Sequence, residues 1–325
     1  MEICRSVSEL EGVLNYLKNA KSICDTGNKS DGPNTIDEKA SVGFVPTMGA
    51  LHRGHISLVN SSVQQASITV VSIFVNPTQF NNASDLEKYP RNTDIDCKLL
   101  EAAGADIAFI PGVEDIYPEG VDFSGMMPKV AKEHGLNNPE KFDFEGLDNY
   151  GEGPRRPGHF YGVAQVVTRL FDIVKPDFAF FGEKDFQQLA IIKHITRILD
   201  YPVRIIACPT LREDDGLAMS SRNMLLSAQQ REIAPEIYKN LLIAREMARA
   251  EKHKKSGEKT LSPKELAELI SAGINEVKGL EVEYAEVLNV TNLQPVQDWN
   301  EASEVQMCVA VYARPVRLID NIKLI

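Results

Sequence analysis

Short apolar runs alternate with amphipathic stretches over the first two thirds of the chain. Residues 42–46 form an apolar run that ends in proline, and residues 68–75 are rich in β-branched side chains, so both are predicted to be buried strands. Further strands are predicted at 105–111, 177–182 and 203–207, with helices at about 56–63, 94–103 and 163–174. Strands that alternate with helices predict an α/β fold, in which helices cover both faces of a parallel sheet.

The pattern changes after residue 207. Long helices are predicted at 227–250 and 263–277, and short strands at 282–288, 306–312 and 316–319. We therefore expect two domains, 1–208 and a smaller α+β domain at 209–325. Residues 1–17 have a helical rhythm and predict a folded first helix. Two polar stretches, 26–39 and 128–154, have too few apolar residues to form core and are expected to be surface insertions.

Composition narrows the class of protein. The 325 residues carry a formal net charge of −11, which disfavours binding to nucleic acids or anionic membranes. The apolar run 68–75 is far shorter than the roughly 20 residues of a membrane helix. Five scattered cysteines, an odd number without a Cys-x-x-Cys pair, fit a reducing compartment. The expected protein is globular and cytoplasmic, without nucleic-acid or membrane partners.

The first predicted strand leads into a loop with two glycines and two histidines and then into a helix. Gly49 and Gly54 let the backbone approach a ligand closely, and the helix behind Gly54 offers unpaired N–H groups to an anion. His52 and His55 lie where phosphates would bind, and they can donate hydrogen bonds as negative charge develops there. In this context the pair indicates adenylyl transfer. The alternative is two incidental surface histidines.

Polar side chains also follow two other predicted strands. Asn76 and Gln79 present neutral amides, which suit the hydroxyls of a small polar substrate, although an Asn-Pro turn with an exposed glutamine is an equal alternative. Gly182 frees the backbone after the strand at 177–182. Lys184 can place positive charge on a transferring phosphoryl group, and Asp185 suits a helix cap or a contact to ribose or metal. An ordinary capped surface turn is the alternative there.

A fourth polar segment lies at the predicted domain junction. Ser220 and Ser221 stand beside Arg222 on a loop that starts with glycine, an arrangement that suits a mobile clamp for polyphosphate. It resembles the second signature loop of class I adenylate-forming enzymes. Arg156 and His159 add cationic donors that are consistent with holding a carboxylate or phosphate.

Four of these segments, in this order, closely resemble the pantothenate synthetase (pantoate–β-alanine ligase) family. They are FVPTMGALHRGH at 44–55, IFVNPTQF at 73–80, FGEKDFQQ at 181–188 and GLAMSSRN at 216–223, and the resemblance runs from about residue 42 to the C-terminus. It implies a Rossmann-like nucleotidyltransferase domain with the HxGH motif, a small C-terminal lid domain and a homodimer. It also implies condensation of (R)-pantoate with β-alanine to pantothenate, with ATP and Mg²⁺, through a pantoyl adenylate and with release of AMP and pyrophosphate.

The same resemblance implies roles for individual residues. The catalytic groups would be His52, His55, Lys184 and Arg222. ATP would be bound by Pro46, Met48, Gly49, His52, His55, Gly182, Lys184, Asp185, Leu211, Met219, Ser220, Ser221 and Arg222. Pantoate would be bound by Gln79 and Gln188, with Asn76, Arg156 and His159 also at the substrate site. No residue is assigned to the metal.

The chain differs from the compact bacterial pattern, and other functions share some of its motifs. Residues 26–39 and 128–154 lengthen it, and both segments resemble eukaryotic versions of the family, including fungal ones. A nucleotide-cofactor adenylyltransferase would share HxGH but needs a phosphate acceptor site in place of paired amides. A class I aminoacyl-tRNA synthetase would need a basic domain for tRNA. A non-catalytic nucleotide sensor has no need for His55, Lys184 and Arg222 together.

Overall fold

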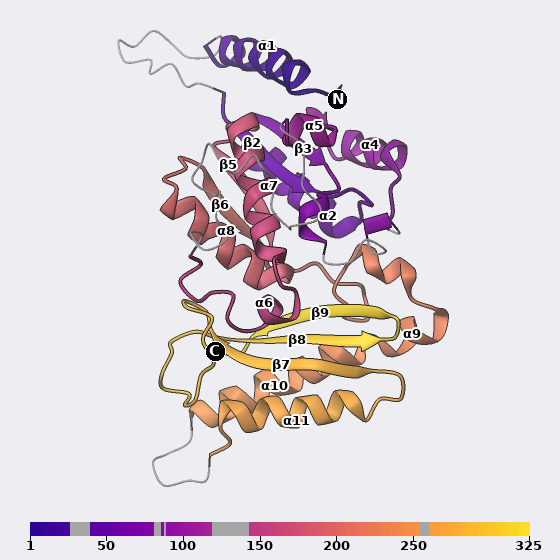
Figure 1. The fold of residues 1–325 in the computed structure, drawn as a ribbon, viewed down its shortest axis with the longest axis vertical. Coiled ribbons are helices and arrows are strands. Elements are labelled where there is room, and N and C mark those ends of the chain that lie inside the picture. Colours follow the sequence, from indigo (N-terminus) through magenta and orange to yellow (C-terminus); the bar gives the residue numbers. More distant parts are fainter. Residues whose placement is uncertain (27–39, 81–85, 88, 119–142, 254–259) are drawn as a thin grey trace. The chain divides into compact units, whose positions relative to one another are not determined.

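Two compact units make up the chain. The computed structural model describes residues 1–26, 40–80, 86–87, 89–118, 143–253 and 260–325 (Figure 1). The first unit comprises Met1–Phe142, Gly158–Gly182 and Ile192–Cys208, and the second comprises Asp143–Pro157, Glu183–Ile191 and Pro209–Ile325. The chain thus enters the second unit for the last time after Cys208, but two earlier segments already belong to that unit.

A six-stranded parallel sheet forms the centre of the first unit. Its order is β1-β4-β3-β2-β5-β6, and every pairing is parallel. The strands are β1 (Glu2–Cys4), β2 (Val42–Thr47), β3 (Ile68–Ile73), β4 (Ile107–Phe109), β5 (Phe178–Gly182) and β6 (Arg204–Cys208). All six residues of β3 are buried, because helices cover both faces of such a sheet. The predicted α/β class is confirmed.

Helices of the first unit pack against one another in pairs. α2 (Arg53–Gln65) contacts α4 (Thr93–Ala102), and α1 (Val7–Thr26) contacts α7 (His159–Val174). These helices confirm the predicted ones. The expected first helix needs a correction, because β1 precedes α1 and pairs with β4 at the edge of the sheet. Three residues are too few to show the two-residue alternation of a strand. The short elements are η1 (Pro77–Gln79) and α5 (Val113–Ile116).

A three-stranded antiparallel sheet and two long helices form the second unit. The strands are β7 (Glu281–Asn289), β8 (Val305–Ala313) and β9 (Val316–Lys323). α10 (Glu236–Lys252) packs against α11 (Pro263–Asn275), and α11 packs against β7 (Figure 1). The core between them includes Leu241, Ile270 and Val309, which are almost fully buried.

Two sequence predictions for the second unit were wrong in part. The single helix expected at 227–250 is divided into α9 (Ala228–Ile233) and α10, with Pro235 between them. Proline lacks an N–H group and clashes with the preceding turn, so it ends one helix and precedes the next. The stretch 128–154 is not wholly a surface insertion, because Phe144 and Leu147 are buried in the second unit. Residues 27–39 and 128–142, most of the two predicted insertions, lie outside the described residues.

Four further elements complete the described chain. They are α6 (Glu152–Arg155), η4 (Glu183–Asp185), α8 (Phe186–Ile198) and η5 (Ser221–Leu225), of which α8 runs from the second unit into the first. Among the described helices, none has both the length and the apolar character that crossing a bilayer requires.

Candidate active site

A buried carboxylate holds the loop between β2 and α2. Gly49 and Ala50 both have positive φ, at 81° and 50°, so the backbone turns sharply after Met48. Asp96 of α4 is 2% exposed, and its carboxylate accepts hydrogen bonds from the N–H groups of Ala50 (2.9 Å) and Leu51 (2.8 Å). Burial raises the pKa of Asp96, and these two hydrogen bonds oppose that rise. The Asp96 carboxylate therefore anchors the backbone of the loop that carries the histidines.

His52 and His55 lie together at the N-terminus of α2. His52 caps the helix, and its Nδ1 accepts from the Gly54 N–H at 3.1 Å. The Nδ1 of His55 accepts from the His52 N–H at 3.4 Å, and the ring centroids are 4.0 Å apart. When Nδ1 accepts, a neutral imidazole carries its proton on Nε2. Each ring therefore has an Nε2–H donor, next to the positive end of a helix dipole.

Asn76 supports the turn that follows β3 and is itself buried, with 1% exposure. Its Oδ1 accepts from the Tyr117 hydroxyl (2.9 Å) and the Thr78 hydroxyl (3.1 Å). Its Nδ2 donates to the Gly162 carbonyl at 3.0 Å. Because the side chain is almost fully buried and both ends of its amide bond within the chain, Asn76 supports the loops around it.

The structure brings Met48, Gln79 and His159 together in the first unit. The Gln79 side-chain amide donates to the Met48 sulfur, which joins the loops after β2 and β3, and its Oε1 accepts from Asn76 Nδ2 at 3.3 Å. A ligand hydroxyl that binds this amide would replace one of these two contacts. His159 opens α7 and is 6% exposed, and its Nδ1 donates to the Gln79 carbonyl at 2.9 Å. His159 therefore holds the backbone of the residue that was expected to bind pantoate. Pro46 lies in β2 directly before this region, opposite Ser72 of β3.

The turn after Gly182 belongs to the second unit. Lys184 lies in η4, with its ammonium 3.4 Å from the Asp185 carboxylate. The two following glutamines differ in their surroundings. Gln187 is buried and donates to the Leu147 and Tyr150 carbonyls, so its amide is used structurally. Gln188 is half-buried, and its side chain makes no hydrogen bond among the described residues.

The loop that leads to the serines forms a small hairpin. Met219 donates its N–H to the Leu211 carbonyl at 3.0 Å. Arg212 makes a bidentate ion pair with Asp320 of β9, at 2.7 and 2.9 Å, and stacks on the Tyr238 ring at 3.5 Å. These contacts anchor the base of the loop that was expected to be a mobile clamp.

Ser220, Ser221 and Arg222 follow at the start of η5. The Ser220 hydroxyl caps this turn and accepts from the Arg222 N–H at 3.3 Å. The Arg222 N–H is therefore paired within the chain, and Ser221 is the first residue of the turn.

Arg156 lies in a cluster of guanidinium groups within the second unit. Burial lowers the pKa of Arg156, and the charges of Arg222 and Arg317 lower it further, whereas Glu152 and Asp185 raise it. The structure thus places the expected ligands Arg222 and Asp185 within electrostatic reach of Arg156.

Glu152 supplies negative charge next to the arginines of this cluster. Its carboxylate accepts two hydrogen bonds from Arg317, at 2.8 and 2.9 Å, and one from the Tyr284 hydroxyl at 2.8 Å. Burial alone would raise the pKa of Glu152, but the hydrogen bonds and charge of Arg317 and the charge of Arg156 lower it overall. Glu152 therefore stays ionised and fixes the segment that carries Arg156.

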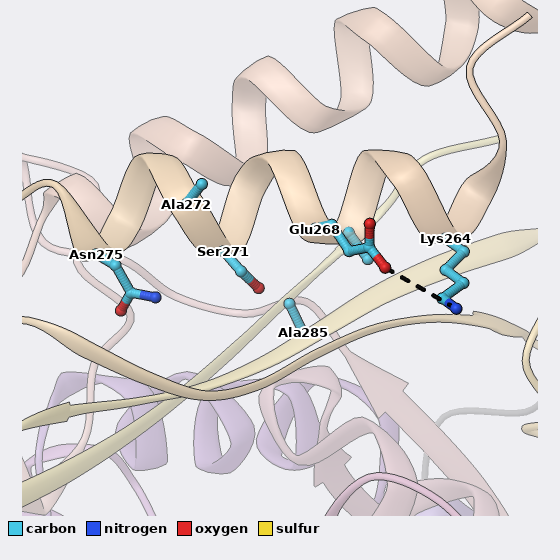
Figure 2. A pocket seen from close by; sticks show the side chains of 7 residues that line it. Lys264, Glu268, Ser271, Ala272, Asn275 and Ala285 are labelled. Carbon is cyan, nitrogen blue, oxygen red and sulfur yellow. Dashed lines mark ion pairs between the residues drawn. The ribbon is translucent and has the colours of Figure 1, made fainter.

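An open pocket elsewhere in the second unit is not the candidate site. It lies between α11 and β7, with an ion pair of Lys264 and Glu268 at 4.0 Å on its rim (Figure 2). None of the expected ligand-binding residues lines it. Among the described residues, no group of three or more His, Cys, Asp or Glu side chains is arranged to hold a metal ion.

Comparison with known sequences places the chain among bacterial relatives. The sequence profile of the family described as Pantoate-beta-alanine ligase matches residues 17–323. The pantothenate synthetase of Bacteroides fragilis (strain YCH46) is 48% identical over 282 residues, 87% of this chain and 90% of that protein. The pantothenate synthetase of Azobacteroides pseudotrichonymphae genomovar. CFP2 is 44% identical over 323 residues, 99% of both proteins. The expected eukaryotic or fungal character is therefore unsupported, because a bacterial relative matches the full length.

Solved structures agree with this placement. The structure of pantothenate synthetase from Thermus thermophilus has a TM-score of 0.77 and 36% identity, covering 100% of this chain and 99% of that chain. The pantoate-beta-alanine ligase of Francisella tularensis, solved in complex with Beta-gamma ATP and β-alanine, has a TM-score of 0.68 and 32% identity and covers 99% and 97%. Fold, motifs and matches over nearly the whole chain agree, and the chain belongs to the pantoate-beta-alanine ligase family.

Proposed function

We propose that the chain joins pantoate to β-alanine in two steps and uses ATP to activate the pantoate carboxylate as an acyl adenylate. Ligase activity follows from family membership. The observation that carries the two-step route is the pair of imidazoles at the start of α2, with ring centroids 4.0 Å apart and each Nδ1 accepting a backbone N–H. This pair suits the charge that develops on phosphoryl oxygens during adenylyl transfer.

In the first step a carboxylate oxygen of pantoate attacks the α-phosphorus of ATP. A new P–O bond forms, the bond from the α-phosphorus to the β-phosphate oxygen breaks, and pyrophosphate leaves. His52 and His55 donate hydrogen bonds to the phosphoryl oxygens. Lys184 and Arg222 carry the positive charge that the departing pyrophosphate requires. No covalent bond to the protein is needed.

In the second step the deprotonated amine of β-alanine attacks the carbonyl carbon of pantoyl adenylate. The amide bond forms, the C–O bond to AMP breaks, AMP leaves with the bonding electrons, and the amine nitrogen releases one proton to solvent. The protein's contribution here is orientation, which can supply effective molarities of about 10⁵ to 10⁸ M. We assign the hydroxyls of pantoate to the amides of Gln79 and Gln188, and an anionic group of the substrates to Arg156.

Mg²⁺, a homodimer and a cytoplasmic location are parts of the same proposal. Mg²⁺ keeps several waters and is usually held by substrate phosphates with one or two carboxylates, so it does not need a cluster of protein ligands. Asp185 supplies a half-exposed carboxylate beside Lys184 for such a contact. The bound ion would neutralise charge on the phosphates of ATP.

One assay separates this function from the alternatives. The purified chain is incubated with ATP, Mg²⁺, pantoate and β-alanine, and AMP and pantothenate are measured by chromatography. We expect both products in equal amounts, and none when pantoate is omitted. Formation of ADP in place of AMP, or of AMP without any need for pantoate, would contradict the proposal.

A further inference from the structure

Strand β9 holds three separate segments that carry expected ligand-binding residues of the second unit. Arg317 binds Glu152, whose segment bears Arg156. Asp320 binds Arg212, at the base of the hairpin that leads to the serines. Asn321 binds the backbone of η4, which bears Lys184. Asn321 is the most informative of the three, because its bonds reach the turn of an expected catalytic residue directly.

The Asn321 side chain uses all its hydrogen-bonding groups except one lone pair. Its Nδ2 donates to the carbonyls of Glu183 at 3.0 Å and Lys184 at 2.8 Å. Its Oδ1 accepts from Gln306 Nε2 of β8 at 2.6 Å. Asn321 and Gln306 are each 7% exposed. An amide has two N–H donors and one oxygen, so Gln306 determines which way the Asn321 amide faces.

These hydrogen bonds determine the position of the Lys184 backbone, from which its side chain extends. Two adjacent carbonyls held by one rigid amide restrict the backbone dihedral angles of the turn between them. The Lys184 ammonium lies at the end of four rotatable side-chain bonds and is 17% exposed, so its position depends on the orientation of this turn. A displacement of about 1 Å in a catalytic group can cost about 100-fold in rate.

We propose that Asn321 is a positioning residue for the ATP half-reaction and that it acts through Lys184. This inference rests on the proposed function, because it takes Lys184 to contact the phosphates of ATP. Asn321 itself touches only the protein. We therefore expect the Asn321→Ala substitution to slow only the step that needs Lys184. The substitution should have no further effect in a variant that already lacks the Lys184 ammonium.

A double-mutant cycle tests the inference. Pantoate-dependent exchange of labelled pyrophosphate into ATP is measured for the wild type, Asn321→Ala, Lys184→Ala and the double variant. We expect Asn321→Ala to lower kcat/KM for ATP about 10- to 100-fold in the wild type but less than about twofold in the Lys184→Ala background. The attack of β-alanine on supplied pantoyl adenylate should stay within about twofold of wild type in Asn321→Ala.

Gln230→Ala is the matched control. Gln230 also donates from one side-chain amide to two backbone carbonyls of the second unit, those of Ala313 and Arg314, but it does not contact η4. The Gln230→Ala variant should keep a pyrophosphate exchange rate within about twofold of wild type. If Asn321→Ala does not fold, Gln306→Leu keeps Asn321 in place and removes only the group that orients it. That variant should show the same pattern with a smaller loss.

The outcomes that overturn the inference are distinct. Equal losses from Asn321→Ala with and without Lys184 would show that it does not act through Lys184. Equal damage to both half-reactions would leave Asn321 with a general structural role. A wild-type chain without pantoate-dependent exchange would overturn the proposed function and this inference together, whereas wild-type exchange with an additive cycle would overturn this inference alone.

Discussion

The carboxylate of Asp96 on α4 accepts a hydrogen bond from the N–H of Ala50, a residue with positive φ in the loop that leads to His52. The two residues are 46 positions apart in the sequence. The same carboxylate accepts the Leu51 N–H. A buried side chain thus pairs two backbone donors in the loop that presents the histidines.

Asp96→Ala should impair adenylate formation, although Asp96 is not expected to contact a substrate. The buried Ala50 N–H and the half-buried Leu51 N–H lose their acceptor, which costs about 1 to 3 kcal/mol for a buried group left unsatisfied. We expect a lower melting temperature and a slower pyrophosphate exchange. Asp96→Asn, which keeps one oxygen, should show a smaller loss of both. The control is Asp94→Ala, on the exposed first turn of the same helix. Equal behaviour of the Asp94 and Asp96 variants would contradict the anchoring role.

His55→Ala should slow adenylate formation by about 10² to 10³ while the fold survives, because one preorganised donor is removed from a site where charge develops. Arg53→Ala, an exposed change at the start of the same helix, controls for disturbance of the helix terminus. Single-turnover formation of pantoyl adenylate is the measurement. A loss of less than about fivefold with normal melting would reduce His55 to a structural cap.

Lys184→Ala and Arg222→Ala should impair the ATP half-reaction selectively. Both residues are assigned to the pyrophosphate, which leaves before β-alanine attacks. Reaction of supplied pantoyl adenylate with β-alanine should therefore remain comparatively intact in both variants. The two half-reactions are measured separately in rapid-quench experiments. If both fall by the same factor, these residues have a structural role.

Gln79→Ala and Gln188→Ala should weaken pantoate binding. A hydroxyl left unpaired in a buried site costs about 1 to 3 kcal/mol, or roughly 5- to 150-fold in affinity. Affinity for a non-hydrolysable ATP analogue should change little. Calorimetric titration of each variant with the two ligands separately measures both affinities. If the affinity for the ATP analogue falls as much as the affinity for pantoate, the assignment of these glutamines to pantoate is wrong.

Gln187→Ala provides a contrast within the same helix. Its amide already bonds to the Leu147 and Tyr150 carbonyls and accepts from the Glu152 N–H. We expect this variant to melt at a lower temperature, because these buried groups lose their partners. Pantoate affinity, measured by calorimetry well below the melting temperature, should fall less than in Gln188→Ala.

The stability of the chain should depend on pH through Glu152. Its pKa is lower in the folded protein than its ordinary value of 4.5, so the unfolded chain binds more protons as the pH falls. The stabilisation by ionised Glu152 is therefore complete above about pH 4.5 and is lost as the pH falls through the lower, folded value. Urea unfolding of wild type and Glu152→Gln should differ at pH 7, and the difference should shrink below about pH 4.5. A constant difference would exclude this titration.

Local sequence patterns predicted the elements that carry the site because those elements are long and continuously apolar. β2, β3 and β5 appear as buried runs, and ligands in such sheets bind beyond the carboxyl ends of the strands. The edge strand β1 was not predicted, since its three residues gain their structure from pairing with β4. The helical periodicity on both sides of Pro235 predicted one continuous helix, whereas this proline separates α9 from α10.

The supporting residues of the site could not be predicted in the same way. Asp96 follows another acidic residue near a helix start, a position that ordinarily indicates a favourable dipole contact on the surface. Glu152 lies in a polar stretch, and its partner Arg317 is 165 residues away. Asn321 lies 137 residues from Lys184. Such long-range polar pairs leave no local pattern, and only the folded chain brings them together.

Pyrophosphate exchange tests the central claim most directly. The chain is incubated with ATP, Mg²⁺, labelled pyrophosphate and pantoate in the absence of β-alanine. If the carboxylate is activated as an acyl adenylate, label should enter ATP at a rate that depends on pantoate and that falls sharply in His55→Ala. Exchange that appears only when β-alanine is added would contradict the account, because it would show that the amine takes part before pyrophosphate leaves.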